Sequence, residues 1–393
     1  MKQARSSTSL LPVPGPASNP APDREQRIVD ELFREQDVEV MGVNYRHGFW
    51  RSVAILFRSL VLSRGDASDL RDALRSGTTV GVGFFRNESN AITQAAAFVK
   101  VDRLISLDLH SLAFIRKVLG WRGLVGETCH FVRAAFATKG WRYAGRLTHP
   151  LLGWLLYRTF QSLLADRKDV AVITTNMQHP ASVGVAWAAA QSAANHSDFL
   201  EHSTTPRVVV CERGYRRVYV NFEHTRKLMI ECGFDADCIQ VMHSVSRPTR
   251  PPGGGAIRKV GICVNFFDSM EAIRDITDVL LDRDIAVTYR VHDADPRLPD
   301  LKRLATERKV ALSDARQSNI TAFLKTVDLI VAGNSNVLAD ALVAGVPPVY
   351  YWSGTPDMMD YYGLVAYHDI PKASDKASLG RVFDELLEAS NTR

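Results

Sequence analysis

Small and polar residues form a turn between an apolar run and a helical stretch in the C-terminal half of the chain. The turn is made of Gly333, Asn334, Ser335 and Asn336. It follows the buried-strand pattern of 328–332, and Ser335 or Asn336 is suited to cap the helix that begins there. A helix N-terminus in this position presents N–H groups and the positive end of the helix dipole. The turn is therefore predicted to bind a phosphate group, and the alternative is a strand–turn–helix connection without a ligand.

Polar residues also follow two other predicted strands of this half. Asn265 comes after the strand 259–264, while Arg290 and His292 close the strand 285–291. Because ligands of parallel sheets bind beyond the carboxyl ends of the strands, these side chains are expected to converge with the turn. Asn265 would help to hold phosphates, and Arg290 or His292 would offset the charge of a diphosphate.

Carboxylates lie close to these groups in the sequence. Asp340 is one turn into the helix and is expected to bind a ribose or sugar hydroxyl, unless it occupies a solvent-exposed helix position. Asp293 and Asp295 offer Arg290 and His292 an alternative role, because salt bridges with these acids would explain the basic residues without a ligand.

Candidates for a general base come from the N-terminal half. They are His179, Glu201, His202 and Glu88. His179 stands between a predicted strand and a predicted helix, and the ordinary pKa of histidine suits proton transfer near neutral pH. Glu201 and His202 belong to one polar segment, and Glu88 follows the apolar strand 79–85. A structural or capping role is the alternative for each of them.

Strand and helix patterns alternate on both sides of a stretch rich in proline and glycine, 246–256. Strands are predicted at 38–43, 79–85, 104–107, 169–174, 207–211, 239–243, 259–264, 285–291, 310–312, 329–332 and 346–351. This alternation predicts an α/β fold with two doubly wound, Rossmann-like domains that face a cleft. Such a cleft is the natural ligand site.

The predicted division of the chain follows from that linker. It comprises a disordered tail (1–25), an N-terminal domain (26–245) with a basic insert (111–160), the linker (246–256), a C-terminal domain (257–373) and a terminal helix (374–393).

The strand–turn–helix–strand unit 328–352 resembles the donor-binding segment of GT-B glycosyltransferases, especially those of bacterial surface and capsular polysaccharides. The resemblance covers 257–373 and, more loosely, 165–245. It implies that the C-terminal domain binds a nucleotide-sugar donor and that the N-terminal domain lies on the acceptor side. His179 and the Glu201 segment are also loosely similar to UDP-GlcNAc 2-epimerases, although Pro180 departs from their histidine–glycine–aspartate signature.

The same resemblance bears on stereochemistry and on metals. Retaining GT-B enzymes often carry two glutamates eight positions apart, whereas Asp340 and Ala332 occupy those positions here. An inverting reaction, which needs a general base, is therefore expected. Asp293 and Asp295 have the spacing of the DxD motif of GT-A enzymes, but the two-domain pattern disfavours that class. No metal and no cofactor are predicted, since the nucleotide-sugar is a substrate.

Composition excludes several classes of protein. The 393 residues carry a formal net charge of +5 and 46 % hydrophobic residues, which describes a globular protein. No run is long and apolar enough to span a bilayer, and no secretory signal is recognised. The five cysteines form no CxxC pair and are expected to be reduced thiols in a cytoplasmic protein. Neither a GxGxxG fingerprint nor a Walker A motif is present.

Basic residues and tryptophans concentrate in 111–160. The three tryptophans of this window are Trp121, Trp141 and Trp154. Together with the amphipathic stretch 46–64, the window is predicted to contact an anionic membrane surface. The alternative is a basic, partly buried helical insert that covers the first domain. The window lacks a nucleic-acid-binding motif, and no nucleic-acid partner is predicted.

The sequence therefore predicts a glycosyltransferase that moves a sugar from a nucleotide-sugar to a glycan or lipid-linked acceptor in surface polysaccharide synthesis. It is expected in the cytoplasm, with peripheral contact to the inner face of the cytoplasmic membrane. The alternatives are a sugar-nucleotide 2-epimerase or a glycerol-phosphate transferase on the same fold, and a binding protein without catalysis.

Overall fold

The computed structural model describes most of the two halves of the chain. The described residues are 24–33, 54, 58, 60, 67–107, 112–139, 147–192, 194–202, 205, 214–242, 256–265, 268–292, 295–315, 318–354 and 359–391. Residues 1–23 of the predicted tail, residues 246–255 of the linker, the strands 38–43 and 207–211 and nearly all of the stretch 46–64 lie outside them, whereas the last two tail residues, 24 and 25, begin a helix.

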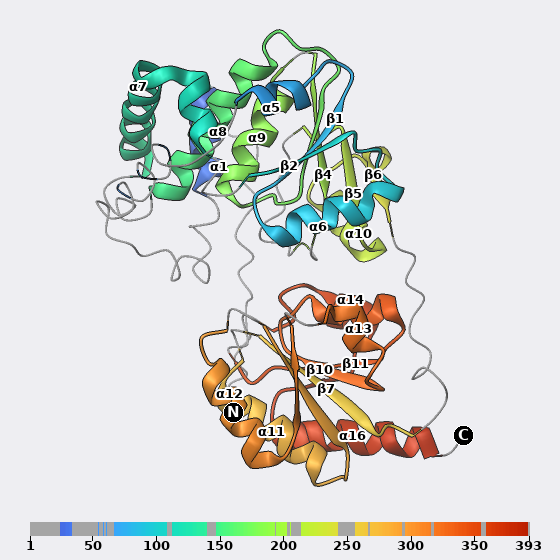
Figure 1. Cartoon of the computed structure of the whole chain (residues 1–393). Coiled ribbons are helices and arrows are strands. Elements are labelled where there is room, and N and C mark those ends of the chain that lie inside the picture. The colour runs from blue at the N-terminus through green and yellow to red at the C-terminus, as the bar shows by residue number, and fades with distance from the viewer. Residues whose placement is uncertain are drawn as a thin grey trace, which may run out of the picture.

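The N-terminal half contains a six-stranded, all-parallel sheet in the order β2-β1-β3-β4-β5-β6 (Figure 1). Its strands are β1 (Thr79–Gly83), β2 (Arg103–Ser106), β3 (Ala171–Thr174), β4 (His196–Leu200), β5 (Arg217–Val220) and β6 (Ile239–Val241). The central strand β3 is buried at every position, as expected for a parallel sheet covered by helices on both faces.

The helices of this half differ widely in length. They are α1 (Arg24–Leu32), α5 (Ala67–Ala73), α6 (Arg86–Gln94) with the 3₁₀ turn η1 (Ala95–Ala97), α7 (Ala113–Lys139), α8 (Thr148–Leu164), α9 (Pro180–Ala190), α10 (Glu223–Glu231) and the 3₁₀ turn η4 (Ala236–Cys238). The long helix α7 is broken at Gly120, whose φ of 68° lies in the left-handed region that favours glycine. Among the described helices, none is long and apolar enough to cross a membrane.

Two glycines allow the backbones of α8 and α9 to touch. A Cβ atom on Gly184 of α9 would overlap the carbonyl oxygen of Gly153 in α8. A Cβ atom on Gly153 would in turn overlap the carbonyl oxygen of Pro180. Both positions therefore need a residue without a side chain, and the contact sets the distance between the two helices.

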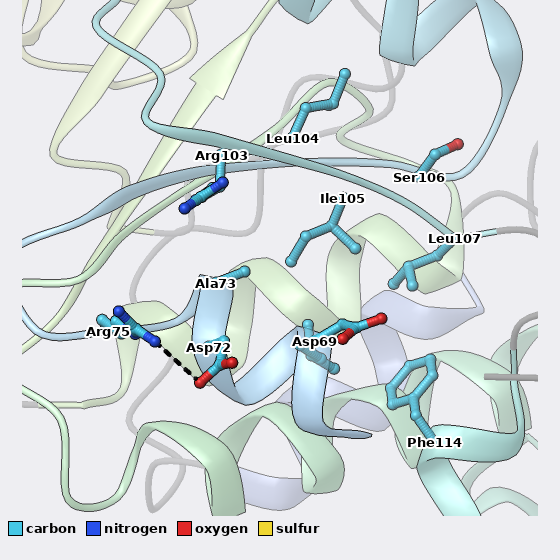
Figure 2. A pocket seen from close by; sticks show the side chains of 11 residues that line it. Asp69, Asp72, Ala73, Arg75, Arg103, Leu104, Ile105, Ser106, Leu107 and Phe114 are labelled. Carbon is cyan, nitrogen blue, oxygen red and sulfur yellow. Dashed lines mark hydrogen bonds and ion pairs between the residues drawn. The ribbon is translucent and has the colours of Figure 1, made fainter. Parts of the chain in front are cut away.

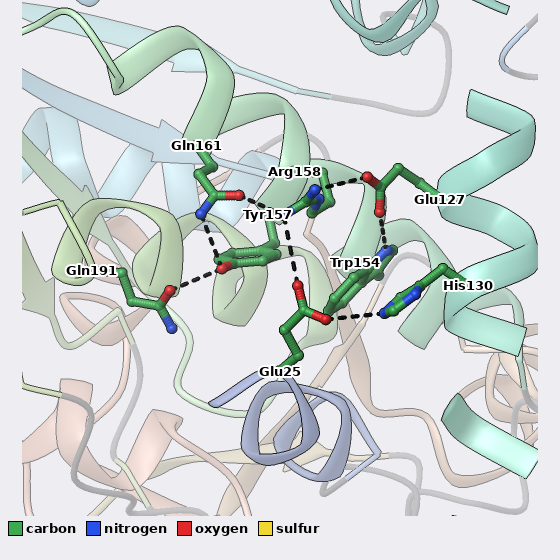
Figure 3. A network of polar contacts seen from close by, with 8 residues as sticks. All are labelled: Glu25, Glu127, His130, Trp154, Tyr157, Arg158, Gln161 and Gln191. Carbon is green, nitrogen blue, oxygen red and sulfur yellow. Dashed lines mark hydrogen bonds and ion pairs between the residues drawn. The ribbon is translucent and has the colours of Figure 1, made fainter. Parts of the chain in front are cut away.

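A polar network joins α1, α7 and α8 beside that contact (Figure 3). Arg158 pairs with Glu127 at 2.9 Å, and the indole Nε1 of Trp154 donates to the same carboxylate at 3.1 Å. His130 and Glu25 lie 3.0 Å apart at the edge of the network. The window 111–160 thus includes a helical layer over the first domain, in which Trp154 is completely buried.

The C-terminal half contains a second six-stranded parallel sheet, in the order β12-β11-β10-β7-β8-β9. Its strands are β7 (Lys259–Val264), β8 (Ala286–Val291), β9 (Ala311–Asp314), β10 (Leu329–Ala332), β11 (Pro348–Tyr351) and β12 (Lys372–Ala373). Its helices are α11 (Met270–Leu281), α12 (Leu298–Arg308), α13 (Ile320–Leu324), α14 (Val337–Ala344), α15 (Leu364–His368) and α16 (Lys376–Asn391). Read from β9, the strand order is that of dinucleotide-binding Rossmann sheets, so the predicted fold class is confirmed.

The terminal helix α16 packs on its own domain. Leu379 and Phe383 are fully buried in the core beneath the second sheet. Arg283, just after α11, donates to Asp384 at 2.8 Å. Among the described elements, all those up to residue 242 thus build on the first sheet, and all those from residue 256 build on the second.

The two domains meet through aromatic rings. Phe222 and His224, at the start of α10, face Tyr367 and His368 at the end of α15. The His224 ring lies 5.2 Å from the Tyr367 ring and 5.3 Å from the His368 ring, measured between centroids. Burial lowers the pKa of His224 to about 4, so this contact is formed by a neutral imidazole at physiological pH.

Candidate functional site

The topological switch point of the second sheet lies between β7 and β10. Asn265 follows β7 and Gly333 follows β10, and these neighbouring strands bring the two residues to the same edge. The side-chain amide of Asn265 donates to the carbonyl oxygen of Asn334. Asn265 and the predicted phosphate-binding turn therefore form one structure, at the position where open α/β sheets bind ligands.

The turn itself is held rigidly. The buried Asn334 accepts hydrogen bonds from the Tyr350 hydroxyl at 3.0 Å and from the Tyr361 N–H at 3.2 Å. A Cβ atom on Gly333 would overlap a carboxylate oxygen of Asp268, so this position needs glycine. These contacts fix the backbone that leads into α14.

The predicted side-chain cap of α14 is at best weak. The Ser335 hydroxyl accepts from the Val337 N–H at the long distance of 3.4 Å. Within the described residues, the side chain of Asn336 makes no capping hydrogen bond, because Asn336 already has helical backbone angles. Of the two predicted capping residues, Ser335 thus accepts a long hydrogen bond and Asn336 occupies the N-cap position without a side-chain cap, while Asn334 shapes the turn.

An arginine that the sequence did not suggest braces the loop after β7. Arg297 donates to both carboxylate oxygens of Asp295, at 3.0 and 2.7 Å, and to the carbonyl oxygen of Asn265 at 2.7 Å. This pairing lowers the pKa of Asp295. Asp268 accepts from the Asn265 N–H at 2.7 Å, and burial raises its pKa to about 6. The ion-pair partner of Asp295 is thus Arg297 at 2.7 Å, whereas the alternative considered from the sequence was a salt bridge of Asp295 with Arg290 or His292.

Arg290 has a structural position in the second domain. Its guanidinium donates to the hydroxyl groups of Ser313 and Ser318, at 2.9 and 2.8 Å, and to the Ser318 carbonyl oxygen at 2.5 Å. Burial lowers its pKa. His292 is exposed after β8. No three His, Cys, Asp or Glu side chains in the described part of the chain are grouped to hold a metal ion.

His202 lies at the carboxyl end of β4 with a defined tautomer. Its Nδ1 is 2.5 Å from the carbonyl oxygen of Thr175, beyond the end of β3. Because a carbonyl oxygen only accepts, Nδ1 carries the hydrogen, and the neutral ring has its lone pair on Nε2. The Glu88 carboxyl group interacts electrostatically with this ring.

Glu201 precedes His202 and is almost completely buried. Its carboxylate accepts from the N–H groups of Thr205 and Asn221, at 2.7 and 2.6 Å, and from the Thr225 hydroxyl at 3.2 Å. Burial outweighs these donors and raises the pKa of Glu201 to about 7. These hydrogen bonds link the ends of β4 and β5. Glu201 therefore holds the backbone of the candidate site in place and also faces that site.

His179 and Glu88 lie deeper in the first domain, near the carboxyl ends of β3 and β1. The His179 ring packs against Phe85 and His149, with centroids 4.9 and 5.9 Å away, and burial lowers its pKa to about 3. Glu88 is fully buried, accepts from the Phe84 N–H at 2.7 Å, and has a pKa raised by burial. The low pKa makes His179 a poor proton acceptor near neutral pH, and complete burial shields the Glu88 carboxyl group from a ligand.

A cavity of about 470 Å³ lies between the two domains and joins predicted residues from both. Glu201 and His202 line it from the first domain, and Asn336 and Asp340 line it from the second. Asp340 is exposed to solvent on α14, as the alternative prediction from the sequence stated, yet protein atoms around its carboxylate desolvate it and raise its pKa to about 6. The volume is typical of small-ligand pockets.

Several cavity residues were missed by sequence reasoning. Asn221 directly follows β5, so the signal of a polar residue after an apolar strand could have found it. Phe98 and Val343 also line the cavity, but a single apolar residue on a helix gives no such signal. Of the predicted phosphate-binding turn only Asn336 belongs to the described lining, which does not include Gly333, Asn334 or Ser335. It also does not include Asn265, His292 or Arg290.

Another cavity, of about 540 Å³, lies away from these residues (Figure 2). It is bordered by α5, the edge strand β2 and the start of α7. Its polar lining includes Asp72 and Arg75, which pair with each other at 3.3 Å. It is larger than the cavity between the domains, but no predicted site residue lines it, so the candidate site is the inter-domain cavity.

No protein-family model and no curated protein matches the chain. Solved structures of GT-B glycosyltransferases and UDP-GlcNAc 2-epimerases resemble its fold. The UDP-GlcNAc 2-epimerase from Neisseria meningitidis, bound to UDP-GlcNAc, is 11 % identical with a TM-score of 0.47, over 80 % of this chain and 92 % of that one. The S. aureus MnaA–UDP structure is 9 % identical with a TM-score of 0.45, over 79 % and 88 %. The apo lipopolysaccharide outer core galactosyltransferase WaaB is 12 % identical with a TM-score of 0.40, over 80 % and 98 %.

Proposed function

We propose that this chain is an inverting, metal-independent glycosyltransferase that acts on a nucleotide-sugar donor. Its acceptor is a glycan or a lipid-linked sugar of surface polysaccharide synthesis. One observation carries the proposal: a single cavity is lined by residues from both domains. On one side lies the end of β4, with His202 as the proposed proton acceptor. On the other side lie the first turns of α14, which follow the glycine-containing turn at the Rossmann switch point.

The roles of the residues follow from their positions. The diphosphate of the donor lies at the turn Gly333–Asn336, where the helix dipole of α14 stabilises the charge that develops on the leaving nucleotide. Asp340 accepts a hydrogen bond from a sugar or ribose hydroxyl. The acceptor oxygen then bonds to the anomeric carbon while the bond from that carbon to the phosphate oxygen breaks. The acceptor proton passes to Nε2 of His202, and the electron pair leaves with the nucleotide.

The two cavity carboxylates favour a 2-epimerase as the second candidate. Glu201 and Asp340 face one cavity from opposite domains. Burial raises the pKa of Glu201 to about 7, and desolvation by neighbouring protein atoms raises that of the exposed Asp340 to about 6. A pair of acids that titrate near neutrality is suited to remove and return a proton at carbon 2 of a sugar. Uptake of deuterium from D₂O into the sugar without an acceptor would identify this reaction, whereas acceptor-dependent release of nucleotide would identify transfer.

The first experiment is thermal unfolding with UDP, CMP, GDP, ADP, dTDP and CDP, each without and with Mg²⁺. A nucleotide that binds the folded state raises the unfolding midpoint by mass action, and we expect one of them to do so without the metal. Stabilisation by none of the nucleotides would contradict the proposal.

The second experiment separates binding from catalysis. His202→Ala is expected to keep nucleotide stabilisation and to lose about 10²–10⁴-fold in turnover, as expected for loss of a general base. His196→Ala, at the opposite end of β4, is the matched control and is expected to keep turnover. Turnover that survives in His202→Ala would remove the proposed role of His202.

We also propose that the protein works in the cytoplasm, against the anionic inner face of the membrane, through the broken part of α7. Trp121 and Val125 are 50 % and 59 % exposed and lie one helical turn apart. Lys117 and Arg122 are exposed beside them, and the Arg116 guanidinium lies 5.2 Å from the centre of the Trp121 ring. Exposed aromatic and basic side chains together favour an anionic lipid surface.

Vesicle flotation tests the membrane proposal. Binding is expected to phosphatidylglycerol vesicles, to be weaker to phosphatidylcholine vesicles, and to fall in Trp121→Ser. Leu104→Ser, which changes an exposed apolar residue on β2, is the control and is expected to bind as the unaltered protein does. Absence of binding to phosphatidylglycerol would contradict the membrane proposal and leave the proposed reaction untouched.

A further inference from the structure

The inter-domain cavity is lined by apolar side chains as well as by the polar groups described above. On the side of the first domain, Ala91, Ala95 and Phe98 line it. Their spacing of four and then three residues places them on one face of α6 and η1. The polar Gln94 lines the cavity on the same face, whose end is the apolar Phe98, 59 % exposed.

The opposite wall, formed by one face of α14, changes from polar to apolar along the helix. Asn336 and Asp340 line the cavity near the helix start, followed by Val343 and Ala344 near its end. At about 1.5 Å per residue, Asn336 and Val343 are roughly 10 Å apart along the axis. Val343 is 50 % exposed. The groups assigned to the donor therefore lie at one end of this face, and an uncovered apolar side chain lies at the other.

Phe98 and Val343 thus expose large apolar surfaces to the same cavity from two different domains. Exposed apolar side chains that line one concave site mark a surface that a ligand covers. Met242 and Leu324 add apolar surface to the same lining, and the proton acceptor His202 also faces the cavity.

We propose that the acceptor is amphipathic. Its hydroxyl-bearing part lies at His202, and an alkyl or aryl group attached to that part lies between Phe98 and Val343. This inference rests on the proposed transfer reaction and names the chemical class of its acceptor. The small residues Ala95 and Ala344 leave room for a chain between the two walls.

The probes are the n-alkyl β-D-glucopyranosides from ethyl to hexyl, titrated calorimetrically below their micellar concentrations. Each methylene that moves from water into the apolar walls should tighten the dissociation constant about fourfold, so the readout is the slope along the series. We expect this slope in the unaltered protein and a clearly smaller one in Phe98→Ser and in Val343→Ser. Ile230→Ser, which changes an exposed apolar residue of α10 outside the described cavity lining, is the matched control and should keep the full slope.

Three results would overturn the inference. The first is a dissociation constant that does not change with alkyl chain length, and the second is a slope that both substitutions leave intact. The third is competition between hexyl glucoside and the stabilising nucleotide, which would assign the apolar walls to the nucleobase. The failure of this inference is distinguishable from failure of the proposed function. A flat series with intact nucleotide stabilisation removes the apolar acceptor alone, whereas absence of nucleotide stabilisation removes the donor site itself.

Discussion

Glu201→Gln is expected to change how the stability of the protein depends on pH. Burial raises the pKa of Glu201 from its ordinary value of 4.5 to about 7. Between these values the folded protein keeps a proton that the unfolded chain has already released, so stability falls as pH rises through this window. At about 1.4 kcal/mol per unit of pKa, the loss by pH 8 amounts to about 3 kcal/mol. Glutamine has no such titration.

The experiment compares urea denaturation of the unaltered protein and Glu201→Gln between pH 4.5 and pH 8. The variant should gain about 3 kcal/mol relative to the unaltered protein over that range. At pH 4.5 it should be the less stable of the two by about 1 kcal/mol, because the glutamine NH₂ group cannot accept a hydrogen bond, whereas the hydroxyl oxygen of the protonated Glu201 can. Asp268 and Asp340 also have raised pKa values, but they are present in both proteins and cancel in the difference.

The control is Glu223→Gln, which changes an exposed glutamate on α10 and should give a pH dependence parallel to that of the unaltered protein. Parallel curves for Glu201→Gln as well would refute the reasoning, because they would show that the folded and unfolded states hold the Glu201 proton equally.

Two further substitutions test the framework of the site. Gly184→Ala should lower the free energy of unfolding by about 3 kcal/mol, since its methyl group would overlap the backbone of α8. Gly126→Ala, where the added methyl meets open space on α7, should be neutral or stabilising by up to about 1 kcal/mol, and equal losses in the two would contradict the packing argument. Arg297→Ala should cost about 3–5 kcal/mol in urea denaturation, because it leaves the buried Asp295 without its partner. Arg303→Ala, at a 69 % exposed position, should stay within about 0.5 kcal/mol, and a similar loss in both arginine variants would remove the bracing role of Arg297.

The second sheet was largely predictable because its strands are short apolar runs with polar ends. The predicted strands 259–264 and 329–332 have the bounds of β7 and β10, and the helix predicted at 336–344 is α14 with one residue more. The two strands are buried almost throughout and α14 has one continuous buried face, so the hydrophobic pattern alone reveals each segment.

The strand β4 shows where this reasoning fails. Its sequence contains Ser197 and Asp198, and polar residues inside a strand conceal the apolar pattern. The buried Asp198 is tolerated because Arg216 pairs with both of its oxygens, at 3.2 and 2.8 Å. That pairing joins β4 to the residue before β5, and a single sequence does not indicate it.

The candidate site was predictable to the same limited extent. The ends of strands supplied Glu201, His202, Asn336 and Asp340, which line one cavity. The choice among the base candidates depends on burial and on the tautomer of His202, both of which are set by contacts between strands far apart in the sequence. The bracing role of Arg297 is likewise a three-dimensional property.

The packing of α16 on its own domain has a consequence for how the site is assembled. The described elements of the two domains are joined by one passage of the chain, residues 243–255. The cavity therefore forms between two domains that a single linker joins. A short linker gives one domain an effective concentration on the order of millimolar relative to the other. Cutting that passage would turn a unimolecular closure into a bimolecular association. The two fragments would then share the site only at protein concentrations that overcome the lost tether, so the chain is a natural starting point for a split enzyme whose activity reports on proximity.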